Sequence, residues 1–334
     1  MATTRIVCFG ELLLRLSAPR RELLLQSPML DVCVGGAEAN VAVALARFGH
    51  AAAMVSVIPP NELGDAALGE LRRHGVDTAA IATRPGRMGL YFLTPGAAQR
   101  PSQVLYDRAD SSFATTPPQY YDWPRLLDGA TALHVSGVTP ATGPHGAAAA
   151  IAAVRTAREH GLHVSFDGNF RAKLWQAWNG DARRILHDIF VCADTVFADH
   201  RDIGIVLGHD FSATPDEASS AAFAAFPHLQ RIVATQRTQH NVDDHELSAT
   251  MITRERNFAT ASHRVGPIVD RIGTGDAFAA GVLHGLLSGM DELASLDFGL
   301  AAGCLKHSVP GDFLLLPASE VAAFLGERRF DVRR

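Results

Sequence analysis

The stretch Asp-Arg-Ile-Gly-Thr-Gly-Asp-Ala-Phe-Ala-Ala-Gly at 270–281 opens an alanine-rich segment that predicts a helix to about Gly289. Gly273 and Gly275 let the backbone approach an anion closely, and the unpaired N–H groups and dipole of a helix start favour negative charge. A carboxylate at Asp276 would repel a phosphate, but it can orient and deprotonate a hydroxyl group. The stretch therefore predicts phosphoryl transfer to an alcohol.

Other interpretations of this stretch are an ordinary loop in which Asp276 is the helix N-cap, or one of the common phosphate loops. The N-cap interpretation stays open. A dinucleotide fingerprint is excluded because Phe278 occupies the position of the third glycine, and no Gly-Lys-Ser or Gly-Lys-Thr run occurs anywhere in the chain.

Outward from this stretch, short apolar runs alternate with segments of helical periodicity. The runs predict strands at 6–9, 53–58, 132–135, 163–166, 195–198 and 231–234, and the periodic segments predict helices at 37–48, 64–74, 144–160, 181–192 and 216–226. Such alternation is typical of an α/β fold with a central, mostly parallel sheet and helices on both faces.

Two segments interrupt the alternation, at about 12–34 and 86–112. The second contains Tyr91 and Tyr106 among turn-forming residues, and both segments predict short antiparallel strands. We expect them to pair into a small separate sheet that covers the crevice at the carboxyl ends of the main strands, as a lid. Because no long linker separates these parts, residues 1–334 are expected to form one domain.

Composition excludes several functional classes. The chain has 334 residues, of which 47% are hydrophobic and 19% charged, and its net charge of −5 supports neither nucleic-acid nor anionic-membrane binding. The four cysteines lack metal-ligand or redox spacing, and the longest alanine-rich run, 146–154, is too short to span a bilayer. With no leader pattern at the N-terminus, a cytoplasmic location is expected.

Two separated motifs carry a resemblance to a known family. Gly35-Gly36-Ala37-Glu38-Ala39-Asn40 and the stretch 270–276 resemble the sugar-binding and catalytic motifs of the ribokinase-like (pfkB) carbohydrate kinases. The resemblance implies that Asp276 is the catalytic base and that the amides of Gly273, Thr274 and Gly275 form an anion hole. It also implies ATP and Mg²⁺ as cofactors.

Within that family the chain is most similar to 2-keto-3-deoxygluconate kinases. The similarity lies in residues 89–91, 106–108, 134–139, 167–171, 174–175, 306–307 and 310–312. It implies that the sugar acid contacts Gly36, Asn40, Tyr91, Tyr106, Arg108, Arg171 and Asp312.

Two of these residues also suit an acidic substrate on physical grounds. Arg108, on the predicted lid, and Arg171, after a predicted strand, can face the crevice, where a guanidinium pairs well with a carboxylate. The alternative is that each arginine is a surface residue or a structural ion pair. By the same resemblance, members that bind neutral sugars carry an aspartate near the first strand, where this chain has Arg15. A neutral pentose is therefore not expected.

The chain departs from the family pattern at two places. The magnesium-associated Asn-x-x-Glu aligns with Asp199-His200-Arg201-Asp202, whose aspartates remain suitable magnesium ligands; the alternative is an ordinary acid-rich helix start. The resemblance implies nucleotide contacts from Asn169, Thr235, Gly273 and Gly275. The glycine that many members carry after the 231–235 strand is missing, so those contacts are expected to differ.

Taken together, these features predict an ATP-dependent kinase that phosphorylates the terminal 6-hydroxyl of 2-keto-3-deoxygluconate. The alternatives are a kinase of the same family for fructose, a nucleoside or another sugar acid, and a non-catalytic sugar-binding regulator on the same fold. The expected partners are small molecules, with a homodimer through the lid as a further expectation.

Overall fold

A central sheet organises the molecule. The computed structural model describes residues 4–326, and within them ten strands form one sheet in the order β13-β12-β11-β10-β9-β8-β1-β4-β5, with β14 paired to β12. The strands are β1 (Arg5–Phe9), β4 (Ala51–Ile58), β5 (Ile81–Thr83), β8 (Ala132–Ser136), β9 (His163–Asp167), β10 (Thr195–Phe197), β11 (Arg231–Asn241), β12 (Asp244–Thr253), β13 (Asn257–Ala259) and β14 (His263–Val265). From β5 to β11 all neighbours are parallel, so the predicted sheet is confirmed.

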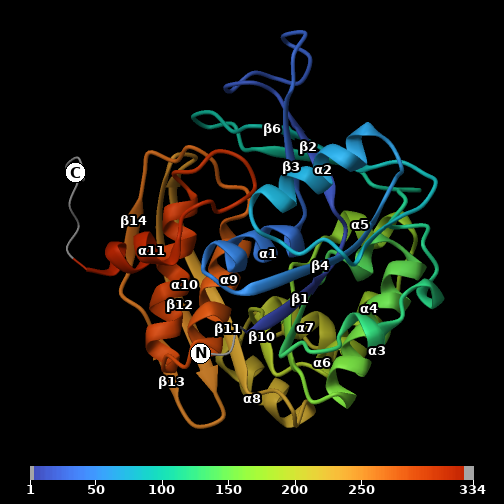
Figure 1. The fold of residues 1–334 in the computed structure, drawn as a ribbon. Helices are drawn as coiled ribbons and strands as arrows, with labels where there is room; N and C mark the ends of the chain where they lie inside the picture. The colour runs from blue at the N-terminus through green and yellow to red at the C-terminus, as the bar shows by residue number, and fades with distance from the viewer. Residues whose placement is uncertain (1–3, 327–334) are drawn as a thin grey trace.

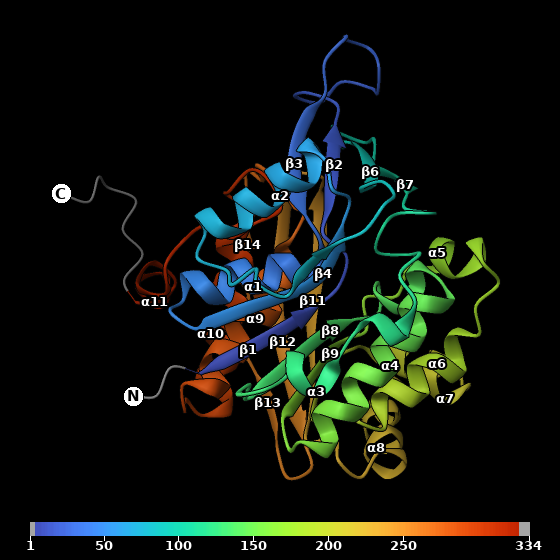
Figure 2. The same cartoon turned by 45° about the vertical axis from the view of Figure 1, so that its right-hand side comes forward.

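Helices cover both faces of this sheet (Figures 1 and 2). One face carries α3 (Trp123–Leu126), α4 (Pro144–Glu159), α5 (Ala172–Ala177), α6 (Ala182–Phe190), α7 (His200–Leu207) and α8 (Pro215–Ala225). The other carries α1 (Ala37–Arg47), α2 (Glu62–Arg73), α9 (Thr274–Leu287), α10 (Glu292–Lys306) and α11 (Ala318–Leu325). Alternate residues of β1 serve the two cores: Val7 and Phe9 pack on the first face, and Ile6 and Cys8 on the second.

The order of the strands fixes where a ligand can enter. β1 lies between β4 and β8. The chain first adds β4 and β5 on one side of β1, and later adds β8 to β11 on the other side. In open α/β sheets, such a switch point leaves a crevice at the carboxyl ends of the strands. The lid stands over this end of the sheet (Figure 2).

The lid is a four-stranded sheet in the order β3-β2-β6-β7. Its strands are β2 (Leu13–Ser17), β3 (Asp31–Gly35), β6 (Gly89–Thr94) and β7 (Gln103–Asp107), which confirms the separate small sheet. The prediction of antiparallel pairing is wrong at one place, because β2 and β6 are parallel. Each segment forms an antiparallel pair, and the two pairs join through their first strands, which run in the same direction.

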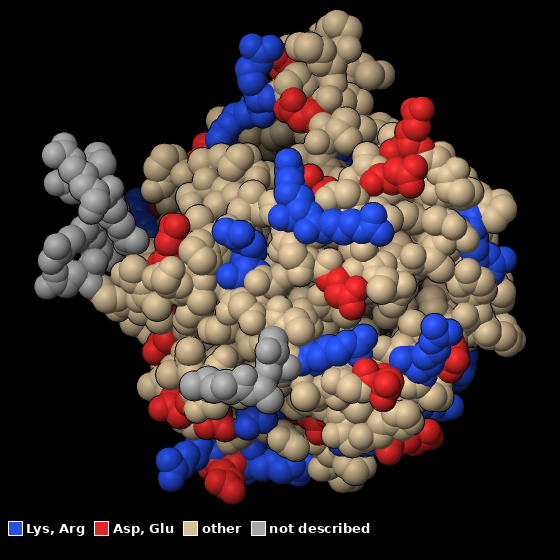
Figure 3. Space-filling model, in the orientation of Figure 1, with Lys and Arg blue, Asp and Glu red and all other residues tan. Residues whose placement is uncertain are grey.

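The long hairpin of β11 and β12 extends beyond the strand predicted at 231–234. Along β12, buried His245, Leu247, Ala249 and Met251 alternate with less buried residues, a clear strand pattern that we did not assign from the sequence. No helix within residues 4–326 has the length and apolar character needed to cross a membrane. On the face shown in Figure 3, basic and acidic side chains are interspersed.

Candidate active site

A cavity of about 620 Å³ lies where the lid meets the rest of the fold, the central sheet with its helices, which is called here the main domain. Its volume is in the range typical of small-molecule sites. The predicted site residues that line it are Gly36, Asn40, Tyr91, Tyr106, Arg108, Asn169, Arg171, Gly273, Thr274, Gly275, Asp276 and Asp312. The fold thus brings the two glycine-containing motifs together around one space.

The start of α9 forms one wall of the cavity. Its N-cap is Gly273, in the left-handed conformation with φ of 76°, where a Cβ would collide with the main-chain oxygen of Asp312. No side chain among the described residues caps this helix start, so its first amides remain available to a ligand. The interpretation of Asp276 as N-cap is wrong, because Asp276 is the third residue of the helix.

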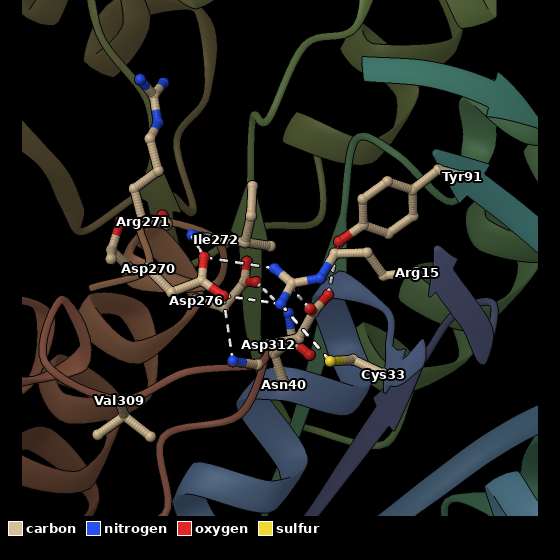
Figure 4. Close-up of polar contacts among 12 residues, drawn as sticks. Arg15, Cys33, Asn40, Tyr91, Asp270, Arg271, Ile272, Asp276, Val309 and Asp312 are labelled. Carbon is tan, nitrogen blue, oxygen red and sulfur yellow. Dashed lines mark hydrogen bonds and ion pairs between the residues drawn. The ribbon is translucent and has the colours of Figure 1, made fainter. Parts of the chain in front are cut away.

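Asp276 combines a specific hydrogen bond with removal from bulk solvent. The Nδ2 group of Asn40 on α1 donates to Asp276 Oδ2 at 2.6 Å (Figure 4). Burial raises the pKa of Asp276 to about 7; the charges of Glu38 and Asp312 also raise it, while the Asn40 bond and Arg171 oppose the shift. A carboxyl group with a pKa near neutrality suits proton transfer at physiological pH.

Two further carboxyl groups near Asp276 were missed by the sequence analysis. Asp167, the last residue of β9, lines the cavity, and burial together with the charges of Asp276 and Asp202 raises its pKa well above the ordinary value. Glu38 is buried, and its Oε1 accepts hydrogen bonds from the amide and hydroxyl of Ser136 and the hydroxyl of Thr139. The end of a predicted strand was a usable signal for Asp167.

Beside the loop of residues 270–275, which is predicted to form the anion hole and is called here the anion-hole loop, a buried arginine joins the lid to the main domain. Arg15 on β2 pairs with Asp270 at 2.7 Å and with Asp312 at 3.2 Å (Figure 4). Tyr91 on β6 donates to Asp312 at 2.8 Å, and Asp270 accepts the amides of Ile272 and Gly311. Arg15 therefore neutralises the charge of the two aspartates. These contacts do not bear on the prediction that Arg15 disfavours a neutral pentose as substrate.

A buried lysine lies near the same carboxylates. Lys306, at the end of α10, is fully buried, and its Nζ donates to the carbonyl of Val309 at 2.8 Å. Burial lowers the pKa of Lys306 to about 8, although Asp270 and Asp312 oppose that shift. The positive charges of Lys306 and Arg15 together compensate the negative charges of Asp270 and Asp312.

The two arginines predicted to bind a carboxylate differ in their surroundings. Arg108 is buried, and its Nε donates to Glu11 Oε2 at 2.6 Å, so it forms a structural ion pair while lining the cavity. Arg171 is exposed, and its Nη1 donates to the carbonyl of Phe170 at 3.1 Å. Arg171 is therefore the freer of the two to meet a ligand.

Three predicted residues lie outside the described lining of the cavity. Asp199 and Asp202 form the capping box of α7, and Asp199 also pairs with Arg201. Thr235 is exposed on β11, whereas Arg237, two residues later, lines the cavity. Sequence analysis also missed Arg271, which follows Asp270 in the anion-hole loop.

Comparison with known proteins agrees with this geometry. The family model of the pfkB family carbohydrate kinases matches residues 3–318. A 2-dehydro-3-deoxygalactonokinase of Haloferax volcanii is 34% identical, covering 97% of each chain, and a 2-dehydro-3-deoxygluconokinase of Bacillus subtilis is 28% identical, covering 97% of this chain and 96% of its own. The solved 2-dehydro-3-deoxygluconokinase of Thermotoga maritima is 36% identical, with a TM-score of 0.90, over 97% of this chain and 99% of its own. This chain therefore belongs to the pfkB family of carbohydrate kinases and has the ribokinase-like fold.

Proposed function

We propose that the protein transfers the γ-phosphoryl group of ATP to the terminal 6-hydroxyl of 2-keto-3-deoxygluconate. The observation that carries this proposal is the position of Asp276, with a pKa near 7, beside the uncapped start of α9 in a cavity lined by lid and main domain. A general base and an anion-stabilising site are the two groups that transfer to an alcohol requires.

In the proposed reaction, the sugar acid lies between the lid and the main domain. Its terminal hydroxyl loses its proton to Asp276 while the hydroxyl oxygen bonds to the γ-phosphorus. The bond between that phosphorus and the bridging oxygen of ADP breaks, and its electron pair leaves with ADP. The amides of Gly273, Thr274 and Gly275 stabilise the charge on the transferring group.

The choice of a sugar acid rests on Arg171 and on the relatives. Arg171 lines the cavity, and beyond its Nη1 bond to Phe170 its guanidinium has further N–H groups that can pair with a carboxylate. Tyr106 lines the same cavity from the lid and can donate a hydrogen bond to the sugar. The names of the similar enzymes from Haloferax volcanii and Bacillus subtilis both specify a 2-dehydro-3-deoxy sugar acid.

The acids at the end of β9 and the start of α7 would suit a magnesium ion that keeps some of its water. Across residues 4–326, no three His, Cys, Asp or Glu side chains group closely enough to ligate a metal together. Asp199 accepts two amides of the helix start and pairs with Arg201, whereas Asp202 accepts the amide of Asp199 through Oδ2 alone, so Asp202 and Asp167 are the better candidates. Bound with the nucleotide, magnesium would neutralise phosphate charge.

The test of this function is the release of ADP across a panel of purified substrates. We expect 2-keto-3-deoxygluconate or its 4-epimer, 2-keto-3-deoxygalactonate, to give a kcat/KM at least about tenfold above that of fructose, ribose or a nucleoside, because loss of a charge-assisted contact costs about that factor. Preference for a neutral sugar would refute the acid assignment. Absence of transfer to every sugar would instead favour the non-catalytic regulator.

The rate should also depend on pH through Asp276. Only the ionised carboxylate can accept the proton, so kcat/KM should rise with pH and level off above about 7. Because the Asn40 bond favours the ionised form, Asn40→Ala should move this inflection to higher pH. The measurement is a pH profile from 5.5 to 8.5; a flat profile, or an inflection unmoved in the variant, would contradict the assignment.

We also propose that two copies pair through the lid. Leu25, Met29, Val32 and Leu105 are between 59% and 81% exposed, and all belong to the lid strands or the loop that joins β2 to β3. Leu25→Asp combined with Val32→Asp should convert a dimer into a monomer on light scattering after gel filtration. A wild-type chain that elutes as a monomer at micromolar concentration would refute the pairing.

A further inference from the structure

Two arginines that line the cavity have no role in the reaction described above. Arg237 comes from β11 and Arg271 from the anion-hole loop. Among the described residues, neither guanidinium donates a hydrogen bond or forms an ion pair. By contrast, Arg108 pairs with Glu11 and Arg171 donates to a carbonyl group. Arg237 and Arg271 therefore bring uncompensated positive charge to the cavity.

These two charges also act on each other. Burial lowers the pKa of Arg271, and the charge of Arg237 lowers it further. Burial likewise lowers the pKa of the neighbouring His245, and both arginines add to that shift. Two cations held near each other without a counter-ion repel, and the entry of an anion between them relieves the repulsion.

The position of the pair indicates which anion it meets. Arg271 lies two residues before Gly273, the N-cap of the helix whose amides face the transferring group. In Figure 4 its guanidinium points away from the cluster of Arg15, Asp270 and Asp312. Arg237 and Arg271 thus line the cavity together with Gly273, Thr274 and Gly275, where we place the transferring phosphoryl group.

We propose that Arg237 and Arg271 together bind the β- and γ-phosphates of the nucleotide. This inference rests on the proposed function, which makes a nucleoside triphosphate the donor. Guanidinium groups match phosphate oxygens in bidentate geometry, and two of them suit a polyphosphate better than a single carboxylate. Arg171 is left for the sugar acid, so the two anionic substrates meet separate cations.

Equilibrium binding tests this assignment without turnover. The probes are the β,γ-imido analogue of ATP with magnesium, and AMP, which lacks the β- and γ-phosphates; both are titrated calorimetrically into the full chain. We expect Arg237→Gln and Arg271→Gln each to weaken binding of the analogue about tenfold and to leave AMP binding within twofold. The lysine variants should lose less, because they keep the charge.

Arg184→Gln is the matched control, since Arg184 lies 65% exposed on α6 outside the cavity lining, and its nucleotide binding should not change. Unchanged analogue binding in both cavity variants would overturn the assignment. So would equal weakening of AMP, or a rise in the KM of the sugar acid alone. The variants could bind the analogue more weakly, as expected, while the wild type phosphorylates no sugar acid. That result would support the phosphate site and refute the proposed substrate.

Discussion

Asp276→Asn should lower kcat by about 10²- to 10⁴-fold, the usual contribution of a positioned general base. Asparagine keeps the shape of aspartate, and its carbonyl can still accept the hydrogen bond from Asn40 Nδ2. Binding of the sugar acid and of the imido analogue of ATP should therefore stay within a few fold. Single-turnover and steady-state rates on the preferred substrate of the panel provide the measurement.

The same experiment separates catalysis from positioning. If Asp276 only orders the start of α9, the asparagine variant keeps that role and its kcat falls by less than tenfold, which would contradict the assignment of a base. Asp276→Ala removes the hydrogen bond as well, yet we expect its kcat to fall about as far as that of Asp276→Asn. Asn40→Ala serves as the companion variant, because it removes the bond and retains the carboxylate.

The parts of this site that sequence predicts are those encoded by local pattern. Short apolar runs, in alternation with helical segments, predicted β1 and β9, and the glycines at 273 and 275 predicted an open helix start. Both features depend on a few adjacent residues. The lid was predicted because the segments 12–34 and 86–112 interrupt the alternation of strands and helices. Asp276 could be selected because it lies in such a local pattern.

The ionic contacts could not be predicted in the same way. Arg15 and Asp270 are 255 positions apart, and Arg108 and Glu11 are 97 apart, so each pairing depends on how the lid meets the main domain. The local sequence around an arginine does not indicate whether its guanidinium contacts a substrate, another side chain or solvent. Arg108 shows this: its predicted contact with a carboxylate is made within the protein, to Glu11.

Arg237 illustrates a second kind of limit. The strand predicted at 231–234 ended before it, and the sequence showed only that a glycine common in the family was absent. In the structure β11 continues to Asn241, paired with β12, which places Arg237 on a regular strand beside the cavity. Hairpin length depends on pairing with a distant partner, and this is why the residue was missed.

Arg15→Leu should lower the free energy of unfolding by about 3–5 kcal/mol, because it leaves two buried carboxylates without their main counter-charge. Arg15 is 4% exposed, and its partners Asp270 and Asp312 are 13% and 2% exposed. Lys306 remains nearby, but its Nζ donates to Val309 and it cannot replace the two-sided contact of a guanidinium. Urea unfolding followed by circular dichroism gives the measurement.

A second arginine of the lid supplies the control for this prediction. Arg21 pairs with Asp243 at 2.6 Å, but the two side chains are 44% and 36% exposed, so Arg21→Gln should cost less than about 1 kcal/mol. Because Asp270 also accepts the amide of Ile272 in the anion-hole loop, Arg15→Leu should lower kcat as well, while Arg21→Gln should not. Equal unfolding midpoints for the two variants would contradict this prediction. They would mean that the cost of desolvating Arg15, Asp270 and Asp312 cancels their attraction, and that packing alone holds the lid to the loop of residues 270–275.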